Sequence, residues 1–208
     1  MNTKEKILEK ALEMFNQRGV EYVGLRELAA LLEMRVSNIT YYFPTKDDLV
    51  NELAVRLNKL NSEVVYERND LTISVFLEML RRVFQNHVKY RCLLLSFVHL
   101  MEQNKVIAAR YRKTQSTRNI MLNSNLKTLV SAGFLKIQDE GGVEFLVSAL
   151  ALVIRFWISE AAVSFSHLSA EKQINHYLTL IAKLLLPYTA AKGKKEIRLF
   201  LAQGQGML

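Results

Sequence analysis

The stretch VSNITYYFPTKDDL, residues 36–49, decides how the first quarter of the chain is interpreted. Ile39 and Phe43 are four residues apart, which places both on one face of a helix at about Val36–Tyr42. Pro44 ends this helix, because proline cannot continue the backbone hydrogen-bond pattern. The remaining positions are polar, so the sequence predicts a short helix with one buried face and one polar, outward face.

Helical patterns flank this short helix on both sides. Thr3 and Gly24 can cap two earlier helices, with Glu27 reaching back to the backbone of Gly24. The expected helices are Lys4–Arg18, Leu25–Leu32 and, after a capping box of Thr45 and Asp48, one beginning at Lys46 or Asp47. Two short helices joined by a tight turn and braced by an earlier helix form a helix-turn-helix. Ordinary packing of three helices is the alternative.

The polar face of residues 36–42 suits the major groove of DNA. Asn38 can bond bidentately to adenine, and small hydroxyl and methyl groups can contact either kind of base pair. Base contacts are therefore expected from Val36, Ser37, Asn38 and Thr40. Phosphate contacts are expected from the hydroxyls and charges of Arg35, Tyr41, Tyr42 and Lys46.

Composition points to an all-α protein with a substantial core. The 208 residues are 50% hydrophobic and include only 2 prolines and 8 glycines, fewer breakers than a β-sandwich or barrel needs. One cysteine, Cys92, excludes an intrachain disulfide and a Cys-rich zinc site. The 4 histidines have no metal-ligand spacing, and no phosphate loop, dinucleotide motif or nucleophile elbow is present. We therefore expect no enzyme, no cofactor and no metal.

The net charge of +8 does not by itself locate a nucleic-acid site. Residues 1–50 carry seven Lys or Arg and eight Asp or Glu, whereas residues 51–135 carry thirteen and six. The excess of positive charge is thus in the middle of the chain. It forms either a solvated basic face or a surface for an anionic ligand. The start of the chain has no apolar signal core, and no uncharged run approaches the length of a spanning helix. We expect a cytoplasmic protein with no membrane partner.

Apolar periodicity predicts further helices after residue 50. Their expected ranges are 47–68, 71–90, 91–103, 105–132, 143–165 and 169–186. The segments 91–103 and 143–165 are apolar almost all round, so the first is expected to be buried on several sides. Two apolar helices near the C-terminus call for a partner surface, with a deep monomer core as the alternative. The basic residues after Pro187 are expected to form a weakly attached tail, with a second nucleic-acid contact as the alternative.

The chain from Thr3 to Leu49 resembles the N-terminal domain of the TetR family of transcriptional regulators. The resemblance rests most on residues 39–49, ITYYFPTKDDL. In this stretch a short helix ends in aromatic residues, a proline follows, and a capped Lys-acid-acid-Leu sequence then starts the next helix. It adds Arg26 and Thr45 to the expected DNA contacts. The chain departs from the family pattern at three places. Gly24 stands where the family often has Ser or Thr, and Glu33 stands where it usually has Gly. The short helix opens with Arg35-Val36-Ser37, which also differs from the family pattern. If the turn needs a left-handed residue, Glu33 costs about 1–2 kcal/mol.

The resemblance also implies an organisation for the whole chain. Residues 1–48 form a helix-turn-helix DNA-binding domain, residues 49–187 a helical effector-binding and dimerisation domain, and residues 188–208 a basic tail. The helices at 143–165 and 169–186 then pair with those of a second copy, and the homodimer reads a palindromic operator in double-stranded DNA. An unidentified small-molecule effector releases the DNA, which makes the protein a repressor. Its expected contacts are Phe97, Met101, Tyr111, Met121, Arg155, Phe156 and Trp157.

Arg155 lies inside an apolar stretch and therefore needs either an anionic ligand or a partner such as Glu160 or Glu102. Two other functions remain open at this point. One is a helical-bundle interaction protein whose first three helices contact proteins. The other is an architectural DNA-binding protein without an effector.

Overall fold

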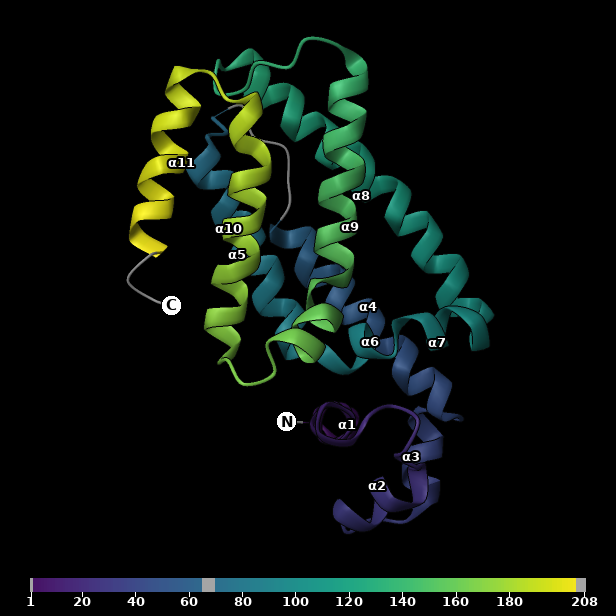
Figure 1. The fold of residues 1–208 in the computed structure, drawn as a ribbon. Coiled ribbons are helices and arrows are strands. Elements are labelled where there is room, and N and C mark those ends of the chain that lie inside the picture. The colour runs from purple at the N-terminus through teal and green to yellow at the C-terminus, as the bar shows by residue number, and fades with distance from the viewer. Residues whose placement is uncertain (1, 65–69, 205–208) are drawn as a thin grey trace. The chain divides into compact units, whose positions relative to one another are not determined.

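The computed structural model describes residues 2–64 and 70–204. This part of the chain is all-α, as expected, with eleven α-helices and one short 3-10 helix, Leu186–Tyr188 (Figure 1). The chain forms two compact units: Met1–Leu60 with Lys89–Lys113, and Asn61–Val88 with Thr114–Leu208. We call them the first and the second unit. The division by function at residues 48 and 187 stays a prediction.

The first unit opens with the helices expected from the sequence, although two capping contacts differ. The N-cap of the first helix is Asn2 rather than Thr3, and the Asn2 side chain accepts a hydrogen bond from the Glu5 amide at 2.9 Å. Glu27 does not cap Gly24 but forms an ion pair with Arg18. The helices are α1 (Thr3–Arg18), α2 (Leu25–Leu31), α3 (Val36–Tyr42) and α4 (Lys46–Val64). The expected continuation of α4 to residue 68 lies outside the described residues.

Helix α3 is anchored by the two apolar residues that the sequence places inward. Ile39 is 0% exposed and Phe43 is 3% exposed. The turn before α3 contains Glu33 at a φ of +52°, so a left-handed residue is required there and is supplied without glycine. The capping box after α3 is confirmed: Thr45 N donates to Asp48 at 3.0 Å, and Asp48 N donates to the Thr45 hydroxyl at 3.2 Å.

The first unit also includes helices that follow much later in the sequence. A single helix was expected at 91–103, but the chain forms α6 (Arg91–Leu95) and α7 (Phe97–Gln103), separated at Ser96. Val98 is 58% exposed, so this segment is not buried on several sides as expected. The first turns of α8 (Lys105–Ser131) complete the unit.

The second unit is a bundle of long helices. Helices α9 and α10 pack against each other, and α10 packs against α11 (Figure 1). Helix α9 begins earlier than the expected residue 143, because Asp139 caps it by accepting from Gly142 N at 2.8 Å. Ser169 caps α10 in the same way, through Lys172 N. The helices are α5 (Ile73–Lys89, whose last residue belongs to the first unit), α9 (Glu140–Ser164), α10 (Ala170–Leu185) and α11 (Ala191–Gly204).

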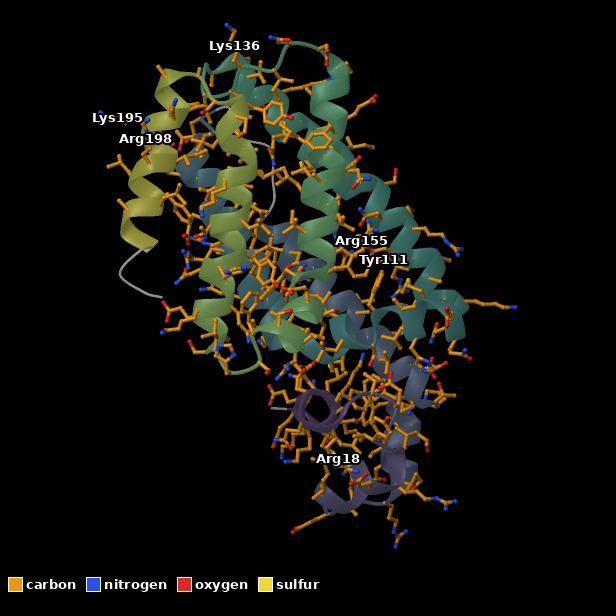
Figure 2. All side chains as sticks on the ribbon, in the orientation of Figure 1. Arg18, Tyr111, Lys136, Arg155, Lys195 and Arg198 are labelled. Atoms are coloured by element: carbon orange, nitrogen blue, oxygen red, sulfur yellow. The ribbon has the colours of Figure 1, made fainter. Side chains whose placement is uncertain are left out.

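The C-terminal segment is not the weakly attached tail that was expected. Its helix α11 buries Ile197 completely, and Glu196 accepts hydrogen bonds from the backbone and hydroxyl of Ser74. A Cβ on Gly193 would lie 2.1 Å from the carbonyl oxygen of Phe134, so only glycine permits this close approach. Basic side chains such as Lys195 and Arg198 extend from the exposed side of α11 (Figure 2).

A buried polar cluster lies within the core of the second unit. Trp157 of α9 stacks on Phe84 with ring centroids 4.6 Å apart, and its indole N–H donates to Nδ1 of His87 at 3.1 Å. The other ring nitrogen of His87 lies 3.3 Å from the side-chain amide of Asn61. Burial, together with the charge of Arg118, lowers the pKa of His87 to about 3, so this imidazole is neutral.

Candidate nucleic-acid interface

Helix α3 presents the expected polar face. Ser37 and Asn38 are exposed, and Tyr41 is 81% exposed with its ring edge-to-face against Tyr42 at 4.9 Å. Because Ile39 and Phe43 hold the opposite face in the core, the helix cannot rotate to bury these side chains without losing its anchor. An exposed amide, a hydroxyl and two phenols on one rigid, short helix can contact both base edges and phosphates.

Three residues expected to contact DNA already have partners within the chain. The Thr40 hydroxyl donates to the Ser37 carbonyl at 3.3 Å, and the Thr45 hydroxyl donates to Asp48 at 2.7 Å. Lys46 Nζ donates to the carbonyls of Val20 and Glu21 at 3.0 and 3.3 Å. Lys46 therefore ties the start of α4 to the loop after α1, a contact that the spacing of the sequence does not reveal.

The other expected DNA contacts lie around this face. Arg26 on α2 and Arg35, the N-cap of α3, are exposed. Val36 is half-buried and packs against the core of the first unit, which leaves only part of its side chain for a thymine methyl group. The structure thus keeps Arg26, Arg35, Ser37, Asn38, Tyr41 and Tyr42 as the exposed candidates.

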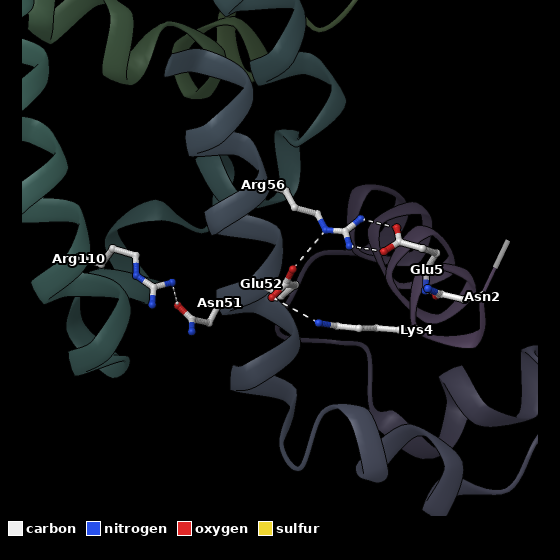
Figure 3. A network of polar contacts seen from close by, with 7 residues as sticks. All are labelled: Asn2, Lys4, Glu5, Asn51, Glu52, Arg56 and Arg110. Atoms are coloured by element: carbon white, nitrogen blue, oxygen red, sulfur yellow. Dashed lines mark hydrogen bonds and ion pairs between the residues drawn. The ribbon is translucent and has the colours of Figure 1, made fainter. Parts of the chain in front are cut away.

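A polar network fixes α4 to α1 within the first unit (Figure 3). The Arg56 guanidinium donates two hydrogen bonds of 2.6 Å to the Glu5 carboxylate and lies 3.5 Å from Glu52. The bond to Arg56 lowers the pKa of Glu5, and that of Arg56 is raised in turn. Bidentate geometry of this kind restricts the orientation of α4 relative to the helix that braces α3.

Sequence reasoning gave no role to Asn16, whose side chain binds backbone groups of α5 and α6. No local pattern could have indicated this, since the groups are more than seventy residues away. Tyr22 was also passed over, although it is 75% exposed on the loop between α1 and α2. A large exposed aromatic beside the helix-turn-helix is a signal that could have been used.

The seven expected effector contacts are divided between the two units. Phe97 and Tyr111 meet edge-to-face at 4.8 Å in the first unit, where Met101 is also half-buried. Trp157 is 1% exposed and serves the core of the second unit, as described above. Met121, Arg155 and Phe156 are half-buried in the second unit, with the Arg155 guanidinium 5.8 Å from the Phe156 ring.

Helix α9 leaves apolar side chains uncovered in the isolated chain. Phe145, Leu152 and Val163 are 53%, 59% and 83% exposed, and Leu180 on α10 is 44% exposed. By length and composition alone, α9 is the one helix among the described residues that qualifies as a membrane span, with 33% of its most apolar window buried. A core helix of a soluble protein passes the same test, so this is weak evidence for a membrane.

A short exposed helix that packs against α1 and α2, with a larger helical unit elsewhere in the chain, is the arrangement of the helix-turn-helix class of DNA-binding proteins. Two family models match the chain. "Bacterial regulatory proteins, tetR family" matches residues 7–53, and "Bacterial transcriptional repressor" of the TetR type matches residues 57–197. The chain therefore belongs to the TetR family of bacterial regulatory proteins.

Two curated regulators are similar to part of the chain. The HTH-type transcriptional regulator LuxR of Vibrio harveyi is 32% identical over 73 residues, 35% of this chain and 36% of that protein. The probable HTH-type transcriptional regulator YttP of Bacillus subtilis is 40% identical over 53 residues, 26% of each chain. The chain thus matches about a third and about a quarter of the length of these relatives.

Solved structures share the fold over nearly the whole chain. A TetR-family transcriptional regulator from Marinobacter aquaeolei VT8 aligns with a TM-score of 0.89 at 22% identity, covering 99% of this chain and 98% of that one. CprB from S. coelicolor A3(2) aligns at 0.72 and 14% identity, with 98% of both chains covered. SmeT in complex with triclosan aligns at 0.64 and 13% identity, over 91% and 92%. At these identities the alignments establish the fold.

Proposed function

We propose that this protein is a homodimeric repressor that reads a palindromic operator with α3 of each copy. The exposed face of Ser37, Asn38 and Tyr41 on an anchored helix carries this proposal. One helix of seven residues contacts only a few base pairs, so useful specificity needs a second copy about one helical turn away. As a regulator of transcription the protein acts in the cytoplasm.

The proposed dimer forms through α9 and α10. The exposed Phe145, Leu152 and Val163 follow one another along α9 at about two and then about three helical turns, so they lie on one face as an apolar stripe, and Leu180 adds to it from the adjacent α10. Pairing such stripes across a two-fold axis buries apolar surface that water would otherwise contact. The proposed dimer therefore contains two copies of α3.

A small-molecule effector is proposed to control DNA binding. SmeT, which shares the fold, is known in complex with triclosan, a chlorinated phenol. Half-buried aromatic and sulfur-containing side chains are the groups that such apolar ligands contact, and within the second unit Met121 and Phe156 are of this kind, with the Arg155 guanidinium 5.8 Å from the Phe156 ring. A ligand that prefers one dimer geometry would shift the population away from the DNA-binding one.

Binding to DNA from the region upstream of the coding sequence tests the DNA-reading head, by which we mean the helix-turn-helix of residues 1–48 with α3. Asn38→Ala and Tyr41→Ala should each weaken binding about 5- to 100-fold, because a base-edge or phosphate contact contributes roughly 1–3 kcal/mol. Gln85→Ala, an exposed change on α5, is the matched control and should bind as wild type does. Unchanged affinity of the Asn38→Ala, Tyr41→Ala double variant would show that α3 does not read DNA.

A further inference from the structure

The side chain of Asn16, near the end of α1, binds the junction between α5 and α6. Its Nδ2 donates to the carbonyl oxygen of Lys89 at 2.9 Å, and its Oδ1 accepts from the amide of Cys92 at 3.0 Å. Lys89 is the last residue of α5, and Cys92 is the second residue of α6. Backbone groups at these positions lack partners within their own helices. One amide therefore caps the end of one helix and the start of the next.

No side chain at the start of α6 performs this capping. The N-cap residue Tyr90 makes no side-chain cap hydrogen bond. Tyr90, Cys92 and Leu93 are all at least nine-tenths buried, in the same hydrophobic core as Ile7 and Phe15 of α1. A polar group buried without a partner is costly, so Asn16 supplies what the local sequence of α6 does not.

A second polar link joins the same elements. The Ser96 hydroxyl, at the break between α6 and α7, hydrogen-bonds to Glu21 in the loop after α1. Partial burial opposes ionisation of Glu21, but this bond, a backbone hydrogen bond and the charges of His99 and Lys46 outweigh it, so the pKa of Glu21 is lowered. Lys46, bound to the Val20 and Glu21 carbonyls, continues the link to the start of α4.

We propose that Asn16 is a positioning residue that joins α6 and α7 to the DNA-reading helices, so that residues 89–113 and the helix-turn-helix move as one body. The chain passes between the two units near residues 60, 88 and 113. Within one copy, any movement of α3 relative to the second unit then occurs at these three passages and not between α1 and α6. This inference rests on the proposed DNA-binding function for its consequence, but the linkage itself is a property of the free protein.

Cys92 makes the linkage measurable, because it is the only cysteine in the sequence. Its side chain is 2% exposed, and burial raises the pKa of Cys92 to about 12, so the thiol reacts with an aromatic disulfide reagent only when the α1–α6 contact opens. In the free protein, Asn16→Ala should raise the reaction rate roughly five- to thirtyfold, as expected for two lost hydrogen bonds.

Gln17→Ala is the matched control for this experiment. Gln17 is the next residue of α1, is exposed, and bonds only weakly to Glu13 of the same helix at 3.4 Å. Its rate should stay within about twofold of wild type, since no contact with α6 changes. Trp157, the only tryptophan, reports from the second unit and should show unchanged fluorescence in both variants. Equal rates in Asn16→Ala and Gln17→Ala would overturn the linkage.

The wild-type protein gives a second test that needs no variant. The Cys92 amide should exchange its hydrogen as slowly as amides in the middle of α1, because Asn16 holds it within the same body. Rapid exchange, as at a frayed helix start, would contradict the proposal even if Asn16→Ala failed to fold.

A DNA experiment separates positioning from a purely structural role. Asn16→Ala should bind a duplex with a single half-site within about twofold of wild type, and a full palindrome about tenfold more weakly or worse, because only the spacing of the two heads is affected. Equal weakening on both duplexes would show that Asn16 serves only the fold of the head, which overturns the positioning role. If wild type bound neither duplex, the proposed DNA binding would fail, whereas the thiol and exchange results would still decide the linkage.

Discussion

Glu33 has an unusual backbone conformation for its residue type. Its φ of +52° is the left-handed region, which costs a residue with a Cβ about 1–2 kcal/mol. The position lies in the turn between α2 and α3, so the strain is located next to the DNA-reading helix.

Replacing Glu33 with glycine should stabilise the first unit. We expect Glu33→Gly to gain about 1 kcal/mol after the greater flexibility of the unfolded chain is subtracted, and to raise the Tm by about 2–4 °C. Circular dichroism during heating measures the change. Glu33→Ala is the control, because alanine keeps the Cβ; an equal gain from alanine would mean that the charge, and not the backbone, causes the effect.

His87 makes the stability of the second unit depend on pH. The unfolded chain binds a proton at this residue near pH 6.5, whereas burial holds the folded-state pKa at about 3. Between these values the unfolded state binds more protons, so the free energy of unfolding falls as the pH is lowered. The stability is complete above about pH 6.5 and decreases towards pH 3.

His87→Gln should remove this pH dependence, because glutamine can accept the Trp157 hydrogen bond but does not titrate. Wild type should lose about 1.4 kcal/mol for each pH unit below 6.5, less whatever other groups contribute. Urea unfolding followed by the fluorescence of Trp157 measures the slope. A His87→Gln protein with the wild-type slope would assign the effect to other groups.

At the scale of helices, local signals predicted much of the structure. Apolar spacing and caps placed α3 at its observed bounds and α10 within one residue of them, because these signals act within one or two turns. The break at Ser96 and the docking of α11 were not predicted, since they depend on contacts with residues far away in the sequence. The same limit applies to the candidate site: Asn38 and Tyr41 were identified from the pattern, but the bonds of Lys46 to Val20 and Glu21 were not.

The docking of α11 depends on the close approach at Gly193. Gly193→Ala would place a Cβ 2.1 Å from the Phe134 carbonyl oxygen, so the helix must shift. We expect a loss of about 1–3 kcal/mol and faster proteolysis within α11. Lys195→Ala, an exposed change on the same helix, should leave both unchanged. If Gly193→Ala resisted protease as wild type does, α11 would not be held by this contact.

At the scale of the whole molecule, the proposed dimer makes DNA binding depend on α9. Leu152→Lys places a charge in the apolar stripe, where burial of an unpaired charge is unfavourable. Sedimentation should show a monomer, and operator affinity should fall at least about tenfold because one head then binds alone. Gln138→Lys, an exposed change in the loop before α9, is the control for added charge. A Leu152→Lys protein that remained dimeric would place the interface elsewhere.

The central claim is that two copies of α3 read one operator, and a hydroxyl-radical footprint on the upstream DNA tests it most directly. We predict two protected half-sites related by symmetry and about 10 base pairs, or a multiple of one helical turn, apart. The double variant Asn38→Ala, Tyr41→Ala should give no protection of the DNA at protein concentrations where wild type protects it fully. A single unsymmetrical protected patch, or protection that survives the double variant, would contradict the account.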